Sequence, residues 1–358
     1  MAGELLIYGA NGYTGQLVAR RATELGLAPV LAGRNGPALA AVARELGRPA
    51  RVFGLQSAAE LDAGLRGAAV VLHCAGPFVH TSAPMAEACL RQGAHYLDVT
   101  GEAVVFEALR GRDAAARAAG VMLLPGAGFD VVPSDCLAAA LAARLPDATR
   151  LDLAFLALGG VSRGTALTAL EHLPSGGLVC RGGRLVPPPR GVRTRDVDFG
   201  RGAVRCACLP WGDVVTAHAS TGIPDVTCWG AVSRAAGLAL RAGPLLAPLL
   251  RRGPLRRAIE RRIARRPAGP DAEARARGRG FFWGEAANVR GERVHARLRT
   301  PEGYAFTADC ATQLARRALQ GARAGFQTPS RFAGAEFVLT LDGVGTEDPW
   351  HAAGTGER

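Results

Sequence analysis

The sequence contains no lysine: all 43 basic residues are arginine, against 31 acidic residues, which gives a net charge of +12. A basic chain of this kind usually prompts a search for nucleic acid or another anionic partner. Aromatic residues, however, make up only 6% of the chain, and no basic stretch is interleaved with the aromatic side chains on which bases stack. The exclusive use of arginine beside abundant alanine and glycine indicates a compositional bias of the source genome. We therefore expect no nucleic-acid partner.

Other features are also missing. No apolar run reaches the roughly 18 residues that a membrane-spanning helix needs. The eight cysteines include no C-x-x-C pair, which is the spacing that zinc sites prefer, and the only close pair is Cys206 and Cys208. Glu4 lies where a secretory signal would need apolar residues. We expect reduced thiols, no metal and a cytoplasmic location.

What the chain does contain is a regular alternation of short apolar runs and helix-length segments up to residue 124. A chain of 358 residues suits two domains. The alternation is typical of βαβ units and a parallel sheet of the Rossmann type. It ends at the glycine-rich stretch 125–128. Residues 159–230 are rich in glycine, proline and arginine, with short alternating runs such as Val214 to Ala219, and they favour a mixed or antiparallel sheet.

The predicted fold is therefore α/β, with a Rossmann-type parallel-sheet domain followed by an α+β domain. We place the first domain at 1–129 and the second, for substrate and dimerisation, at 130–329, with 330–358 packing back onto the first. Within the first domain we expect a helix over 84–92 and a single helix over 102–119. A further helix is expected over 305–322.

A glycine-rich turn follows the first predicted strand. Gly9 permits a tight turn, Gly12 lets backbone N–H groups approach a pyrophosphate, and Gly15 lets the next helix pack closely. Arg34 ends the following strand, where folds that prefer NAD usually carry an acid. A guanidinium can pair with a 2′-phosphate, so the sequence predicts NADP(H) rather than NAD.

Six ordered blocks of sequence resemble the saccharopine dehydrogenase-like NADP-binding oxidoreductases, and within them the trans-acting enoyl reductase branch. The blocks are residues 9–15, 31–34, 74–78, 95–102, 128–135 and 269–275. The strand ends and loops in these blocks supply the expected cofactor site: Gly9, Asn11, Gly12, Tyr13, Thr14, Gly15, Arg34, Cys74, Ala75, Gly76, Pro77, Phe78, Gly101 and Phe129.

Three residues are candidates for catalysis. Asp130 follows a glycine-rich turn at the expected domain junction, and Tyr96 approaches the end of a strand. Ser162, in a Gly/Ser-rich stretch, could donate a hydrogen bond to a substrate carbonyl, although a polar loop before a helix explains it equally well. Asp98, Thr100 and Glu102 suit either the site or the capping of a helix.

The resemblance implies an NADPH-dependent reductase that acts on the C=C bond of an α,β-unsaturated acyl thioester in lipid or polyketide metabolism. Two alternatives remain open: a reductase of C=N bonds, which would need an inward-pointing arginine such as Arg163, and a non-catalytic NADP-binding protein. The substrate is a small molecule or a carrier-bound acyl chain. Segment 245–279 is rich in arginine and leucine, and it could dock an acidic acyl carrier protein, bind an anionic membrane surface or simply be solvated. A homodimer is expected only because such assemblies are common.

Overall fold

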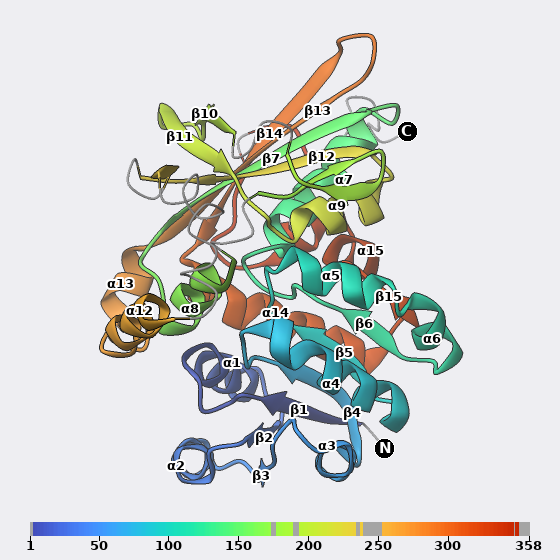
Figure 1. The fold of residues 1–358 in the computed structure, drawn as a ribbon. Coiled ribbons are helices and arrows are strands. Elements are labelled where there is room, and N and C mark those ends of the chain that lie inside the picture. Colours follow the sequence, from blue (N-terminus) through green and yellow to red (C-terminus); the bar gives the residue numbers. More distant parts are fainter. Residues whose placement is uncertain are drawn as a thin grey trace. The chain divides into compact units, whose positions relative to one another are not determined.

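A computed structural model describes residues 3–172, 177–188, 193–233, 237–238, 253–346 and 348–350 (Figure 1). The chain divides into two compact units. Unit 1 contains Met1–Val132 and Tyr304–Gly334, and unit 2 contains Pro133–Gly303 and Ala335–Arg358. Each is described below by itself. None of the helices described is long and apolar enough to cross a membrane.

Unit 1 is built on a seven-stranded sheet in which every pair of neighbouring strands is parallel. The strand order is β15-β6-β5-β4-β1-β2-β3, so the chain reverses direction across the sheet beside β1, as in Rossmann folds. The strands are β1 (Glu4–Tyr8), β2 (Val30–Gly33), β3 (Ala50–Val52), β4 (Ala68–His73), β5 (His95–Asp98), β6 (Met122–Leu124) and β15 (Gly325–Phe326). The predicted parallel domain is confirmed.

Eight helices surround this sheet among the described residues of unit 1. They are α1 (Tyr13–Glu24), α2 (Gly36–Leu46), α3 (Ala58–Leu65), α4 (Phe78–Gln92), α5 (Ala103–Arg110), α6 (Asp113–Ala118), α14 (Gly303–Gln320) and α15 (Pro329–Ala333). Helix α1 contacts α2, whereas α3, α4 and α5 form a second series of contacting helices. The returning helix α14 is tied to α1 by an ion pair of 2.8 Å between Arg21 Nε and Asp309 Oδ1.

The structure corrects several expectations for unit 1. Helix α4 begins at Phe78, six residues before the expected start, and it includes Pro84. The helix predicted over 102–119 is two helices, α5 and α6. The segment that returns to unit 1 is 304–334 rather than 330–358, and the chain from Ala335 belongs to unit 2. Packing explains this last difference, because α14 buries an apolar face that includes Phe306, Ala311 and Leu314.

Unit 2 contains a mixed sheet with the path β10-β11-β12-β7-β13-β14, in which only β12 and β7 are parallel. Strand β8 pairs with β12 and β9. The strands are β7 (Arg150–Leu158), β8 (Val179–Arg181), β9 (Arg184–Val186), β10 (Thr194–Asp198), β11 (Ala203–Cys208), β12 (Asp225–Ala231), β13 (Arg279–Ala287) and β14 (Arg293–Pro301). This agrees with the predicted α+β unit with a mixed sheet.

Helices pack on one face of this sheet, where the side chains of Leu137 and Leu141 in α7 lie against Gly284 of β13. Helix α9 contacts β12, and it occupies the run Val214 to Ala219 that we expected to be a strand. That run is apolar without a clean period of two, and four of its residues are buried in the helix. The helices of unit 2 are α7 (Val132–Arg144), α8 (Arg163–His172), α9 (Asp213–Thr221), α12 (Pro254–Ala264), α13 (Ala272–Arg277) and the 3₁₀ helix η2 (Ala335–Thr340).

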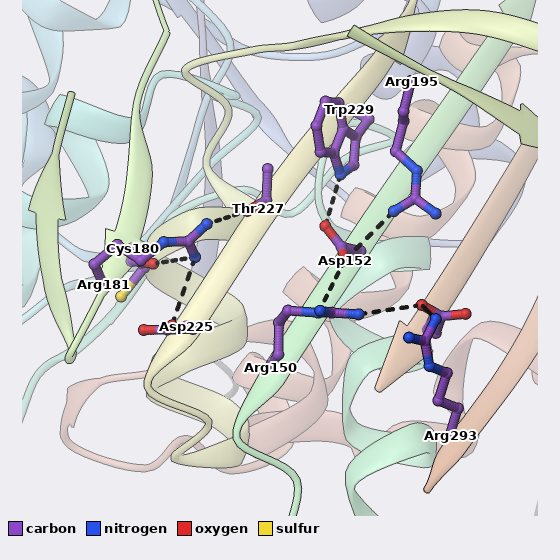
Figure 2. A network of polar contacts seen from close by, with 10 residues as sticks. Arg150, Asp152, Cys180, Arg181, Arg195, Asp225, Thr227, Trp229 and Arg293 are labelled. Atoms are coloured by element: carbon purple, nitrogen blue, oxygen red, sulfur yellow. Dashed lines mark hydrogen bonds and ion pairs between the residues drawn. The ribbon is translucent and has the colours of Figure 1, made fainter. Parts of the chain in front are cut away.

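The other face of the sheet carries an aromatic cluster that includes Trp229, Phe281 and Trp283. Cys206 and Cys208 are part of the same core, which explains the close pair in the sequence as packing. A buried carboxylate orders the edge of this cluster (Figure 2): Trp229 Nε1 donates to Asp152 Oδ1 at 2.9 Å, and Arg195 lies 3.4 Å from Asp152. Within the described ranges no group of three His, Cys, Asp or Glu residues could hold a metal ion.

Candidate cofactor and catalytic site

The glycine-rich turn lies between β1 and α1, at the carboxyl ends of the parallel strands. Gly9 has φ +83°, a conformation that glycine adopts readily, and its N–H donates to Ala32 O at 2.8 Å. A Cβ on Gly15 would lie 2.1 Å from Gly9 O, so helix α1 approaches the turn as closely as a glycine allows. Gly12 is exposed and caps α1 without a side chain. The turn therefore leaves backbone N–H groups at a helix N-terminus open to an anion.

Arg34 comes directly after β2, next to this turn. Its side chain is exposed, and no carboxylate in the described part of the chain pairs with it. Its charge lowers the pKa of Tyr8, which burial raises by more, so the guanidinium lies near the end of β1 as well. An unpaired guanidinium at the end of β2 is suited to a 2′-phosphate.

The loop 74–78 follows β4 and is held by Glu102. The buried Glu102 carboxylate accepts hydrogen bonds from the N–H groups of Phe78, at 2.7 Å, and Val79, at 2.9 Å. These are the first N–H groups of α4, which otherwise lack partners within the helix. This cap explains why α4 begins as early as Phe78. It comes from a residue 24 positions later, so local sequence could not reveal it.

Asp98 connects the loop that follows β5 with the loop that follows β6. Its Oδ1 accepts from the N–H groups of Thr100, at 3.0 Å, and Gly126, at 2.9 Å. Its Oδ2 accepts from the Tyr96 hydroxyl at 2.7 Å. Burial raises the pKa of Asp98 to about 6, against the lowering effect of these three hydrogen bonds. Asp98 is fully buried, so it supports the loops that face a cofactor without reaching one.

Asp130 lies on the loop after β6, against the backbone of Gly101. A methyl group at Gly101 would lie 2.9 Å from Asp130 Oδ2, so glycine leaves the space that this carboxyl group fills. Burial raises the pKa of Asp130 to about 7, and the negative charge of Glu102 contributes to the rise. The residue as a whole is of intermediate exposure, while its carboxyl group lies in a buried environment. Near neutral pH it can therefore hold a proton and release it.

Helix α14 completes the site from the far end of the chain. Phe129 N–H donates to Thr307 Oγ1 at 3.0 Å, which fixes the loop that carries Asp130. The ring of Tyr304 meets that of Tyr13 edge to face, with centroids 5.0 Å apart. Neither Tyr304 nor Thr307 was a candidate from the sequence, because nothing near residue 304 marks it as a neighbour of the glycine-rich turn.

Comparison with known proteins agrees with this geometry. Residues 5–124 match the family model described as the saccharopine dehydrogenase NADP-binding domain. This part of unit 1 is therefore similar to the NADP-binding domain of saccharopine dehydrogenase. The cofactor of this domain is NADP(H), as the exposed Arg34 at the end of β2 indicated.

Curated proteins similar to this chain include saccharopine dehydrogenase-like oxidoreductases and trans-acting enoyl reductases. A saccharopine dehydrogenase-like oxidoreductase of Homo sapiens is 30% identical over 151 residues, 37% of this chain and 35% of the relative. A trans-acting enoyl reductase of Mycobacterium leprae is 35% identical over 142 residues, 37% of this chain and 34% of the relative. A putative trans-acting enoyl reductase of Mycobacterium tuberculosis is 31% identical over 186 residues, 48% and 44% of the two chains. The matches thus span less than half the length of these curated relatives.

The fold extends beyond the NADP-binding domain. Apo saccharopine dehydrogenase (L-Glu forming) of Saccharomyces cerevisiae superposes on 97% of this chain and 100% of its own, with a TM-score of 0.61 and 11% sequence identity. At that identity the likeness concerns the fold alone. Both units therefore follow the saccharopine dehydrogenase fold.

The predicted catalytic residues have different surroundings. Asp130 and Tyr96 lie in unit 1, but Tyr96 is fully buried and its hydroxyl donates a hydrogen bond to Asp98, so we now assign Tyr96 to the support of the loops. Ser162 lies in unit 2, where its buried hydroxyl accepts from Thr165 N–H at 3.1 Å and caps α8. Capping accounts for Ser162 without a role in catalysis. Arg163 is exposed, so the inward-pointing arginine expected for a C=N reductase is not found at that position.

Proposed function

We propose that this protein is an NADPH-dependent reductase that saturates the C=C bond of an α,β-unsaturated acyl thioester. The NADP-binding domain and the relatives named trans-acting enoyl reductases support the reaction class. The observation that carries the proposal is Asp130, whose carboxyl group lies against Gly101 and whose pKa is raised by burial to about 7. A reduction of this kind needs a proton donor beside the hydride donor.

In the proposed reaction, bound NADPH supplies a hydride, which is a proton with two electrons, to the β-carbon of the substrate. The electrons of the C=C bond move onto the thioester oxygen, and the enolate then takes a proton at the α-carbon. Asp130 is the proposed source of that proton and recovers one from solvent. Glu102 and Asp98 act as positioning residues, because they fix the loops at the strand ends that hold the cofactor.

We also propose that the substrate is delivered by an acidic carrier protein that docks on α12. Five arginines of this helix and the turn after it are exposed and have no carboxylate partner among the described residues: Arg257, Arg261, Arg262, Arg265 and Arg266. A positive surface accelerates encounter with an acidic partner. Residues 245, 246, 249 and 250, the leucines of the membrane alternative, lie outside the described residues. Carrier delivery predicts that KM for a carrier-bound substrate rises with salt, whereas KM for the same acyl chain on pantetheine does not.

The test of the reaction is consumption of NADPH with an enoyl thioester, a cyclic imine, and a 2-oxo acid mixed with an amine. Turnover of the thioester alone supports the proposal, and turnover of only the imine or the oxo acid with amine contradicts it. Asp130→Asn should lower kcat by about 100-fold or more, because general acid catalysis typically contributes a factor of at least that size. NADPH affinity should stay unchanged. The control is Asp62→Asn, since Asp62 pairs with Arg91 on the surface. NADPH binding with no turnover of any substrate would favour a non-catalytic NADP-binding protein.

A further inference from the structure

A cavity of about 300 Å³ opens in unit 2 between arginine side chains. It is lined by Arg279, at the start of β13, by Arg299 and Pro301, at the end of β14, and by Gly343. Arg279 is the cross-strand partner of Pro301, and Phe281 is the partner of Arg299. The backbone of Arg299 is also bridged to Gly345, which places the 343–345 segment along β14. Two guanidinium groups thus share one pocket built on paired strands.

A third guanidinium, that of Arg201 in the turn between β10 and β11, lies close to the same strand pair. Arg201 lies over the ring of Phe281, 5.2 Å from its centroid. Phe281 is opposite Arg299 and two residues from Arg279. The side chains of Arg279, Phe281 and Arg299 therefore lie on the same face of the strand pair. The pocket itself has the guanidinium groups of Arg279 and Arg299 as its charged part and Pro301 as its apolar part, and Arg201 adds positive charge near the same strand pair.

Three other arginines of the same sheet are paired with carboxylates. Figure 2 shows Arg150, Arg195 and Arg293, whose guanidinium groups pair with the carboxylates of Asp152 or Glu285 at 3.4 to 3.6 Å. Among the described residues, no carboxylate lies within ion-pair distance of Arg201, Arg279 or Arg299. Grouped positive charges without counter-ions repel one another, and an anion between them relieves that repulsion.

The donors of the pocket are also oriented. Arg279 Nη1 donates to the carbonyls of Ala276, at 2.8 Å, and Gly278, at 2.6 Å, which holds the guanidinium at the end of α13. Its other N–H groups have no partner in the described ranges, nor do the side-chain donors of Arg299. A planar guanidinium group with free N–H donors matches the oxygens of a phosphate, which can accept hydrogen bonds from two guanidinium groups at once.

We propose that the pocket lined by Arg279 and Arg299 binds the phosphate ester group of a ligand. A phosphate monoester carries nearly two negative charges and several acceptor oxygens, so it matches two guanidinium groups better than a single carboxylate does. A cavity of about 300 Å³ is at the small end of ligand sites, which suits one phosphate group with the carbon chain next to it. The site stands on the geometry of unit 2 and does not depend on the proposed reaction.

The test is titration of the full chain with inorganic phosphate, followed by ³¹P NMR and calorimetry, with NADP⁺ at saturation so that the cofactor site is filled. Arg299→Ala should weaken phosphate binding by at least tenfold, and Arg299→Lys, which keeps the charge but loses the fork, should weaken it less. The matched control is Arg293→Ala on the same strand and face, because that arginine is paired with Glu285; its phosphate affinity should equal that of the wild type.

Two results would overturn the proposal: phosphate affinity that is the same in Arg299→Ala, Arg279→Ala and the wild type, or acetate binding as tightly as phosphate. Coenzyme A and its form without the 3′-phosphate then identify the source of the group. A preference for coenzyme A supports recognition of the 3′-phosphate, and equal binding that is still lost in Arg299→Ala supports recognition of the diphosphate. Failure of the enoyl thioester assay would leave this binding result unaffected.

Discussion

Replacing Arg34 by alanine should weaken the binding of NADPH while leaving the binding of NADH nearly unchanged. Arg34 is exposed at the end of β2 and has no carboxylate partner within the part of the chain that the structure describes. In the cofactor complex we expect its guanidinium to pair with the 2′-phosphate, the only group that distinguishes NADPH from NADH. The two cofactors therefore separate the contribution of this one contact from all others.

The magnitude follows from the chemistry of that contact. A hydrogen-bonded pair with a charged group contributes about 1.5 to 3 kcal/mol, and exposure to solvent places Arg34 in the lower half of that range. A loss of about 2 kcal/mol corresponds to a roughly 30-fold increase in the Kd of NADPH. Arg34→Lys should recover part of the loss, because lysine keeps the charge but not the planar fork.

The assay is calorimetric titration of the wild type and the variants with each cofactor at fixed salt. Arg20→Ala is a suitable control, since Arg20 lies on α1 of the same unit but already pairs with Glu45. The reasoning is refuted if Arg34→Ala binds NADPH as tightly as the wild type, or if NADH and NADPH lose affinity to the same extent. The second outcome would mean that Arg34 acts on the turn or on adenine rather than on the 2′-phosphate.

The remaining predictions concern Glu102 and Asp98, the two buried carboxylates that hold the loops of the site. Glu102→Gln removes a negative charge that raises the pKa of Asp130, so that pKa should fall below about 7. The limb of the pH profile on which kcat falls with rising pH should then move to lower pH, and an unmoved limb would contradict the assignment. Asp98→Ala leaves the Tyr96 hydroxyl and two N–H groups without their acceptor. At about 1 to 3 kcal/mol each, partly offset by water, this should lower the free energy of unfolding in urea by about 3 to 5 kcal/mol, and a loss below about 1 kcal/mol would argue against the network.

The parts of the protein that could be predicted are those whose signals are local. The alternation of strands and helices follows from short-range periodicity, and the roles of Gly9 and Gly15 follow from backbone conformation and close approach within seven residues. Arg34 could be identified because a Rossmann unit places the end of its second strand beside the glycine-rich turn. Each of these features is complete within a single βαβ unit, so the sequence alone is enough.

The features that escaped prediction depend on residues far apart in the chain. Glu102 sets the start of α4 from 24 positions away, and Thr307 holds Phe129 from 178 positions away. The helix α9 replaced an expected strand because its apolar side chains are buried in unit 2, and burial overrides the weak local pattern. The arginine pocket likewise appears only when β13, β14 and the 343–345 segment are brought together. Sequence by itself determined the fold of the NADP-binding domain and its cofactor. The tertiary structure decided which polar side chains contact one another, because contacts between distant segments leave no trace in local periodicity.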